Sequence, residues 1–266
     1  MAASHKEMKI VSIGAGNLAT NLCVALHKSH HDILQVFSRK STSAECLACR
    51  IGASPVTDME LIATDADIYI VSVTDSALAD VARRLVDHLE AGNQGGALPL
   101  IVHTAGSIAM DVIPAARRGV VYPMQTFSKQ RLVDFSQIPI FIEANYADDL
   151  EMLRLFATSL SSHVQVLSST DRRYLHLAAV FCSNFTNHCY ALADKILSQH
   201  NVPFSAMLPL IDEVAAKVHS MPPHEAQTGP ARRHDANVMN EHIELLTNDK
   251  RLQNIYKIMS ESIADD

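Results

Sequence analysis

Two segments near the start of the chain have residue types that suit a dinucleotide phosphate site. Gly14, Gly16 and Ala19 form a Gly-x-Gly-x-x-Ala pattern directly after the apolar run 9–13. The first glycine permits a tight turn, the second lets a phosphate approach the backbone, and Ala19 lets the following helix pack close to the strand. The first turn of that helix offers N–H groups to an anion. The expected phosphate-binding residues are Gly14, Ala15, Gly16, Asn17 and Leu18.

The end of the expected second strand indicates which dinucleotide binds. A site for NAD usually has Asp or Glu there, which binds the ribose 2′-hydroxyl. This chain has Ser38, Arg39 and Lys40 instead. No carboxylate is present to repel a 2′-phosphate, and a guanidinium can bind a phosphate through two hydrogen bonds. The segment favours NADP as the cofactor. The alternative is that Arg39 and Lys40 form the ordinary solvated start of a helix.

Further candidates follow two later strand-like runs. In an open parallel sheet, ligands bind beyond the carboxyl ends of the strands. Val73 and Thr74 are expected to line the ribose of the cofactor, and His103 and Thr104 to face the nicotinamide. A third strand end lies at 121–126. The alternative for each is a plain strand-to-helix turn, in which small and hydroxyl residues are common.

A long helical segment, about 168–200, has polar residues within an apolar sequence. At 100° per residue, His176, Ser183 and Asn187 lie within about 20° of one direction, with Asn184 about 80° away. Polar groups on an apolar helix face are costly unless they form hydrogen bonds. A substrate or cofactor is one partner for them, and helix packing or a subunit contact is the alternative.

A turn near the C-terminus has several charged residues. Thr228, Gly229 and Pro230 favour a turn, and Arg233 and Asp235 follow it. Such a loop could hold an anionic substrate, whereas the alternative is a capped turn with solvated arginines.

The elements that must position these residues fall into two parts. Up to about Ser162, strand-like and helix-like segments alternate, which predicts right-handed βαβ units in a mostly parallel sheet. After it the chain has only helical patterns. We expect an α/β fold, with a dinucleotide-binding domain at 1–162 and an all-helical domain at 163–266. The Gly-rich segment 91–97 is typical of a mobile surface loop. The expected strands are 9–13, 34–38, 53–56, 67–73, 100–104, 120–122, 138–142 and 164–167, and the expected helices are 17–29, 43–51, 76–88, 168–200, 204–220, 237–246 and 251–263.

Composition excludes several classes of partner. The chain has 266 residues, 48% of them hydrophobic, and a formal net charge of −7, without a basic stripe that would bind nucleic acid. No apolar run is long enough to span a membrane, and the polar N-terminus has no signal-peptide pattern. We therefore expect a cytoplasmic protein. The five cysteines are scattered, Cys46 and Cys49 lack a second ligand pair, and no histidine pair has metal-ligand spacing, so no metal site is expected.

Several of these motifs together resemble a known family. The chain is similar to the Rossmann-like proteins with a DUF2520 C-terminal domain, a branch of the pyrroline-5-carboxylate reductase and F420-dependent NADP reductase superfamily whose members are described as NADP oxidoreductases. The resemblance implies a Rossmann domain followed by a helical domain that dimerises through its long helices. It rests on Gly14–Asn17, His103–Gly106, Tyr122–Phe127, His176–Asn184, and Thr228–Pro230 with Arg233 and Asp235.

The chain also departs from better-understood relatives. Hydroxyacid dehydrogenases and ketopantoate reductases have a catalytic lysine on the first long helix, followed by asparagine at four-residue steps. The matching steps here are His176, Val180 and Asn184, and the nearest lysine beyond them is Lys195. Within its own branch, His234 stands where glycine is usual.

Together these features predict an NADP-dependent oxidoreductase that transfers a hydride to or from a small carbonyl or imine substrate in the cleft between the domains. His176 is the expected proton donor, Asn184 orients the substrate, and Arg233 holds a carboxylate. The missing lysine motivates the alternative, a non-catalytic NADP-binding sensor or scaffold. A flavin-type cosubstrate is a third possibility.

Overall fold

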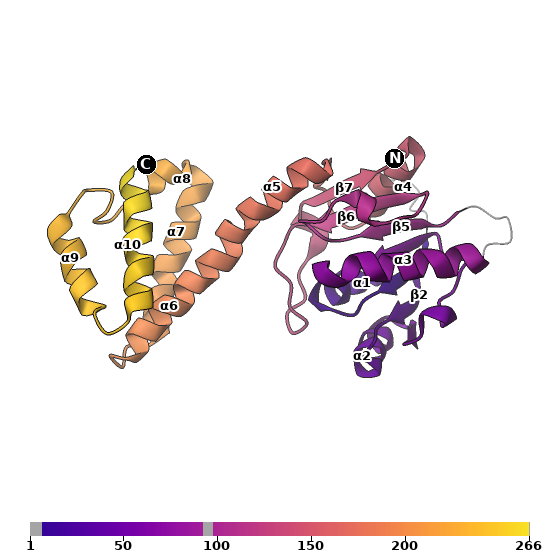
Figure 1. Cartoon of the computed structure of the whole chain (residues 1–266), viewed down its shortest axis with the longest axis horizontal. Coiled ribbons are helices and arrows are strands. Elements are labelled where there is room, and N and C mark those ends of the chain that lie inside the picture. Colours follow the sequence, from indigo (N-terminus) through magenta and orange to yellow (C-terminus); the bar gives the residue numbers. More distant parts are fainter. Residues whose placement is uncertain (1–6, 93–97, 266) are drawn as a thin grey trace. The chain divides into compact units, whose positions relative to one another are not determined.

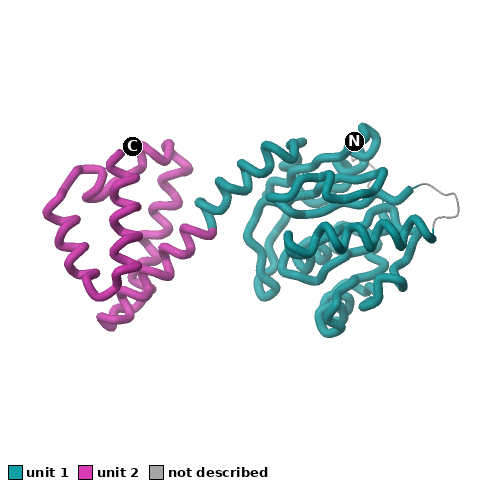
Figure 2. Tube along the Cα trace, in the orientation of Figure 1, with its two compact units in different colours: residues 1–183 teal, residues 184–266 magenta. Residues whose placement is uncertain are grey.

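The chain divides into two compact units, residues 1–183 and 184–266 (Figure 2). The structure, a computed structural model, describes residues 7–92 and 98–265. The expected glycine-rich loop falls largely outside the described residues, because 93–97 are not among them, whereas Ala91 and Gly92 end a helix.

Unit 1 is built on one eight-stranded sheet (Figure 1). Its strand order is β3-β2-β1-β4-β5-β6-β7-β8, in which only the β6–β7 pair is antiparallel. The order 3-2-1-4-5-6 is that of the Rossmann dinucleotide-binding fold, with its switch point between β1 and β4. The strands are β1 Lys9–Ile13, β2 Asp32–Phe37, β3 Ser54–Val56, β4 Ile68–Val71, β5 Leu100–His103, β6 Arg118–Pro123, β7 Ile140–Ala144 and β8 Val164–Val166.

Helices cover both faces of this sheet because its central strands are apolar on both sides. In β4, Ile68 and Ile70 pack in one core cluster, while Tyr69 and Val71 pack in another. This is the alternation that a strand buried on both faces produces. Helices α1, α2 and α4 contribute to the first cluster and α3 to the second. The helices are α1 Asn17–Lys28, α2 Ser41–Ile51, α3 Asp75–Gly92 and α4 Ala147–Thr158.

Helix α4 was not among the helices expected from the sequence. Its first turn has the acidic residues Asp148 and Asp149, which suit a helix N-terminus, and Leu153 and Phe156 are fully buried. The three-residue spacing of these two apolar residues was the available signal.

The expected long helix is present, but its middle is not α-helical. Helix α5 (Ser169–Val180) continues through a π-helical segment, Phe181–Phe185, into α6 (Thr186–Ser198). A π-helix has more residues per turn than an α-helix, so the 100° spacing assumed for the polar stripe does not hold across it. Within this segment the Ser183 hydroxyl donates to the Ala179 carbonyl at 2.6 Å, a bond inside its own helix.

The division between the units lies beyond the boundary expected at residue 162. The first turns of α5 belong to unit 1, because Arg172 is buried there and its guanidinium binds Glu143 of β7 and the Ile108 carbonyl. The domain boundary at residue 162 stays a prediction.

Unit 2 is all-helical (Figure 1). The Asp249 carboxylate forms a salt bridge with the Lys195 ammonium at 2.5 Å and accepts a hydrogen bond from the Leu252 amide at 3.0 Å. It therefore joins α6 to the start of α10. Beyond α6 its helices are α7 Leu208–Ser220, α8 Pro223–Ala226, α9 Ala236–Leu245 and α10 Lys250–Asp265. Across the described part of the chain, no helix combines the length and apolar character needed to cross a membrane.

Candidate functional site

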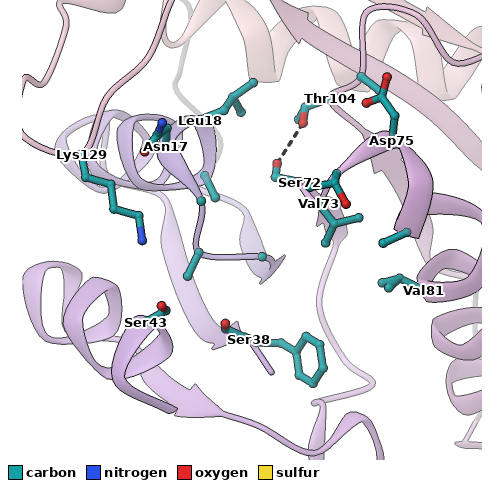
Figure 3. Close-up of a pocket in the computed structure, with 18 of the residues that line it drawn as sticks. Asn17, Leu18, Ser38, Ser43, Ser72, Val73, Asp75, Val81, Thr104 and Lys129 are labelled. Carbon is teal, nitrogen blue, oxygen red and sulfur yellow. Dashed lines mark hydrogen bonds between the residues drawn. The ribbon is translucent and has the colours of Figure 1, made fainter. Parts of the chain in front are cut away.

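A pocket of about 930 Å³ lies in unit 1 at the carboxyl ends of the parallel strands (Figure 3). It is lined by the turn after β1, the end of β2, the turn after β4 and the end of β5. This is the position in which an open α/β sheet binds a ligand. The expected cofactor residues that line it are Gly14, Ala15, Gly16, Asn17, Leu18, Ser38, Arg39, Lys40, Val73, Thr74 and Thr104.

The two glycines of the first turn have different reasons to be glycine. Gly14 has φ +125°, and a Cβ atom there would overlap the backbone carbonyl of Ser72. Its amide donates to the Phe37 carbonyl at 2.8 Å, which ties the turn to β2. A Cβ atom on Gly16 would meet no atom within 4 Å. The protein itself therefore requires Gly14, whereas the space at Gly16 stays open towards the pocket.

The N-terminus of α1 faces this open space without a side-chain cap. Gly16 occupies the N-cap position, and no side chain in the described residues accepts a hydrogen bond from the first turn. Ser168 caps α5 and Asp235 caps α9, whereas α2 and α4 lack a side-chain cap as α1 does. Uncapped N–H groups and the helix dipole favour an anion at this end of α1.

The end of β2 contributes polar and cationic side chains to the pocket. Ser38 is partly buried, while Arg39 and Lys40 are exposed. Two residues that the sequence analysis did not select join them, Ser43 from the first turn of α2 and Lys129 from the loop after β6. Figure 3 shows the Lys129 side chain extending towards the side of the pocket where Ser38 and Ser43 lie.

The ends of β4 and β5 are joined by a hydrogen bond between side chains. The hydroxyls of Ser72 and Thr104 lie 3.0 Å apart (Figure 3). Both residues are buried, yet both reach the pocket wall. This bond holds the two central strand ends at a defined separation beside the glycine turn.

His103 occupies a different position from the one expected. Its side chain is 0% exposed and does not belong to the pocket lining, so its imidazole does not face a ligand there. Instead its Nδ1 accepts a hydrogen bond from the Ala105 amide at 3.1 Å, and Ala105 does line the pocket. Burial, followed by the charge of Arg172, lowers the pKa of His103 to about 4. His103 is a neutral residue that supports the pocket wall from behind.

At the opposite end from the β2 cations, Tyr122 and His176 meet. The Tyr122 hydroxyl lies 3.1 Å from Nδ1 of His176, and the two rings pack edge to face. A Cβ atom on Gly106 would lie 2.5 Å from that same Nδ1, so only glycine fits beside the pair. All three residues line the pocket. Burial raises the pKa of Tyr122, which keeps its phenol protonated at neutral pH.

His176 owes its place to the buried first turn of α5. Arg172, one turn earlier, donates to Glu143 Oε2 and to the Ile108 carbonyl, both at 2.6 Å, and its side chain is 1% exposed. Ser169 adds two further bonds to Glu143. These contacts fix the start of the helix on the sheet and therefore fix the side chain one turn along it.

Two of the three expected catalytic residues lie in unit 2. Asn184 begins that unit, and Arg233 lies in the turn before α9, where its amide donates to the Gly229 carbonyl. The roles of Asn184 and Arg233 stay predictions, and of the three only His176 lines the pocket of unit 1.

The described residues contain no group of three or more His, Cys, Asp or Glu side chains arranged to hold a metal ion. The polar groups around the pocket are hydroxyls, backbone and side-chain amides, three cations, one imidazole and a single carboxylate, that of Asp75. Such a set suits an anionic organic ligand better than a cation.

Two family models match the chain. Residues 3–128 match a Rossmann-like domain, and residues 138–263 match a domain of unknown function, DUF2520. No curated protein matches the chain.

Solved structures similar to the chain extend over nearly its full length. A putative NADP oxidoreductase from Bacteroides fragilis is 48% identical, with 99% of this chain and 100% of that chain covered and a TM-score of 0.92. An imine reductase from Myxococcus stipitatus in complex with NADP+ is 16% identical, with 97% and 92% covered and a TM-score of 0.62. A pyrroline-5-carboxylate reductase from Coxiella burnetii is 15% identical, with 97% and 99% covered and a TM-score of 0.59. The last two show a shared fold alone.

Proposed function

The chain belongs to the Rossmann-like proteins that carry a DUF2520 domain, and from that premise we propose that it is an NADP-dependent oxidoreductase acting on a small carbonyl or imine substrate. The proposal rests mainly on the glycine turn between β1 and α1. Gly16 leaves its space unfilled by protein beside the uncapped N-terminus of α1. A pyrophosphate fits such a site because it needs close backbone approach and unpaired N–H donors.

The residues at the end of β2 favour NADP over NAD as the cofactor. Ser38, Arg39 and Lys40 line the pocket there without a carboxylate among them. A 2′-phosphate binds hydroxyls and guanidinium groups, and it would be repelled by the Asp or Glu that an NAD site usually has.

The bound nicotinamide supplies the hydride chemistry. The chain has to orient the substrate and supply a proton to the oxygen or nitrogen that the reduction leaves basic. His176 is our candidate for this proton donor. The acid form of His176 is the imidazolium, whose Nδ1–H would donate to the Tyr122 oxygen 3.1 Å away and whose Nε2 proton would pass to the substrate, which leaves the ring neutral. Asn184 orients the substrate in this proposal, and Arg233 holds a substrate carboxylate.

Calorimetric titration with NADPH and with NADH tests the cofactor assignment. We expect NADPH to bind tightly and NADH at least about tenfold more weakly, since one lost charge-assisted contact changes affinity by about that factor. A screen of carbonyl and imine compounds, read by NADPH oxidation, then follows. Binding of neither nucleotide would contradict the proposal. Tight NADPH binding without turnover of any compound would favour the sensor or scaffold function.

We also infer that unit 2 pairs with a second copy of the chain. The described residues of α6, α7 and α9 include no buried side chain. On α7, Leu210, Val214 and Val218 follow at four-residue steps and are 58%, 57% and 48% exposed. Such a stripe is typical of a helix face that packs against a partner.

Sedimentation velocity tests this pairing. The wild-type chain is expected to sediment with twice its monomer mass, and Val214→Glu to sediment as a monomer because a carboxylate would be buried in the contact. Asp212→Asn, one exposed position on the same helix, is the control and should stay paired. A wild-type monomer would contradict the inference.

A further inference from the structure

We propose that Lys129 is, in addition to Arg39, a cationic anchor for the 2′-phosphate of the cofactor, on the side of the pocket where Ser43 lies. This inference rests on the proposed function. It assigns a specificity role to a residue that lies far from the glycine turn in the sequence and that no pattern around β2 would select.

Lys129 has a position that suits an anion. Its side chain is partly buried in the pocket wall and extends towards Ser38 and Ser43 (Figure 3). Within the described chain, its ammonium forms no salt bridge or hydrogen bond. A lysine without a protein partner that points into a polar pocket is available for a ligand of opposite charge.

The charges around the pocket are unequally distributed. Its lining includes three basic side chains, Arg39, Lys40 and Lys129, and a single carboxylate, that of Asp75. Asp75 lies on the other side of the pocket from Lys129 (Figure 3) and accepts a hydrogen bond from the Ser107 hydroxyl. The end of the pocket formed by β2 and α2 is therefore cationic, and a 2′-phosphate carries about two negative charges.

The loop that carries Lys129 is anchored to helix α1. The Asn21 side chain donates to the Ser128 carbonyl at 2.9 Å and accepts from the Val133 amide at 3.0 Å. The same Nδ2 donates to the Asn17 carbonyl at 2.9 Å, and Asn21 is 2% exposed. One buried amide thus ties the residue before Lys129 to the first turn of α1.

A ring contact closes the base of the same loop. Phe127 and Phe135 stack with their centroids 5.8 Å apart. With Asn21 at one side and this stack at its base, the loop presents Lys129 at a defined place. An anchored backbone lowers the entropy cost of using a long, flexible side chain to bind a ligand.

The chemistry distinguishes this role from binding of the pyrophosphate. Ser38 directly follows β2 and Ser43 lies in the first turn of α2, where a dinucleotide places the adenosine ribose. NADPH has a phosphate there and NADH has a hydroxyl. An ammonium that binds the 2′-phosphate affects NADPH alone, whereas one that binds the pyrophosphate affects both nucleotides equally.

Calorimetric titration of the full chain with NADPH and NADH tests this inference. Lys129→Ala is expected to weaken NADPH binding on the order of tenfold or more and to leave NADH binding within about twofold of wild type. Lys129→Arg keeps the charge and should keep most of the preference for NADPH. Lys28→Ala removes a lysine on α1 that does not line the pocket, and it should change neither affinity. Thermal unfolding should be unchanged in Lys129→Ala, because the side chain has no protein partner to lose.

Each contrary outcome has a separate meaning. Unchanged NADPH affinity in Lys129→Ala overturns the inference while the proposed function stands, because the wild-type chain still binds NADPH. Equal weakening of NADPH and NADH also overturns it, since it would move the ammonium to the pyrophosphate. Binding of neither nucleotide by the wild-type chain overturns the proposed function and this inference with it.

Discussion

The Tyr122 hydroxyl lies 3.1 Å from Nδ1 of His176, and this contact joins strand β6 to the first half of the long helix. The pair lies at one end of a pocket whose other end is cationic. Gly106 leaves room for it, since any larger residue would contact both rings. A buried phenol that stays protonated can hold one ring nitrogen of the imidazole while the other acts on a substrate.

Removal of the His176 imidazole should separate catalysis from cofactor binding. His176→Ala is expected to lower kcat by about 10²- to 10⁴-fold, the range for loss of a general acid, with NADPH affinity within about twofold of wild type. Steady-state kinetics on a substrate found in the screen, together with calorimetry, measure both. Tyr174→Phe, a change at a 71% exposed position on the same helix, is the control. Wild-type turnover in His176→Ala would rule out the imidazole as proton donor.

Substitution of the two glycines of the first turn should affect different properties, stability in one case and cofactor binding in the other. Gly14→Ala is expected to lower the free energy of unfolding by several kcal/mol, because its Cβ overlaps the Ser72 carbonyl and its φ is +125°. Gly16→Ala adds a Cβ to open space, so it should cost about 1 kcal/mol or less. It should nevertheless weaken NADPH binding at least about tenfold, because the methyl group occupies the phosphate position.

Urea unfolding and calorimetry on the two variants distinguish these effects. Undiminished NADPH affinity in Gly16→Ala would show that no phosphate approaches that backbone.

The Arg172–Glu143 pair should be essential to the start of α5. Arg172→Met leaves the Glu143 carboxylate, which is 18% exposed, without its charged partner, and we expect a loss of about 3–5 kcal/mol of unfolding free energy. Arg173→Met changes the neighbouring exposed residue and should cost less than about 0.5 kcal/mol. Urea denaturation of both variants is the measurement. Equal effects at the two positions would mean that the buried pair does not hold the helix.

His103 should make the fold sensitive to mild acid. Its folded-state pKa of about 4 lies below the ordinary value of 6.5 because burial disfavours the charged imidazole. As pH falls from about 6.5 towards 4, the unfolded chain therefore takes up a proton at His103 that the folded chain does not. The stability that neutral His103 contributes is complete above about pH 6.5, and it is lost with a slope of up to about 1.4 kcal/mol per pH unit as the pH approaches 4.

His103→Asn tests this titration. The variant should be less stable at pH 7, because a packed ring is lost, but its stability should fall less steeply between pH 6.5 and 4 than that of wild type. His224→Asn, an exposed position in unit 2, should leave the slope unchanged. If the stability of wild type and of His103→Asn falls equally steeply between pH 6.5 and 4, the lowered pKa of His103 would be contradicted.

Hydrophobic periodicity was sufficient for most of unit 1. The expected strand at 9–13 matches β1, and the expected helix at 17–29 ends one residue beyond α1. These elements have strong local patterns, and their turn residues have specific backbone requirements. Helix α4 was missed although Leu153 and Phe156 have helical spacing, and the π-helical segment 181–185 was missed because no local pattern marks it.

The residues of the pocket also differ in how well the local sequence predicted them. The glycine turn and Ser38–Lys40 were predictable because residues close in the chain form them. His103 and Thr104 are neighbours in sequence, yet only Thr104 lines the pocket. Successive side chains of a strand point to opposite faces, so an uncertainty of one residue at the strand end exchanges the two roles.

The sequence by itself determined the strand-turn-helix unit at residues 9–28 and the type of ligand it suits, because these depend on backbone freedom and charge within a short segment. Only the tertiary structure decided that Lys129 reaches the β2 end of the pocket and that Tyr122 meets His176. Both depend on contacts between distant segments, such as the hydrogen bond from Asn21 to the Ser128 carbonyl and the burial of Arg172 against β7. Such contacts follow from how the whole core packs, and no spacing along the chain encodes them.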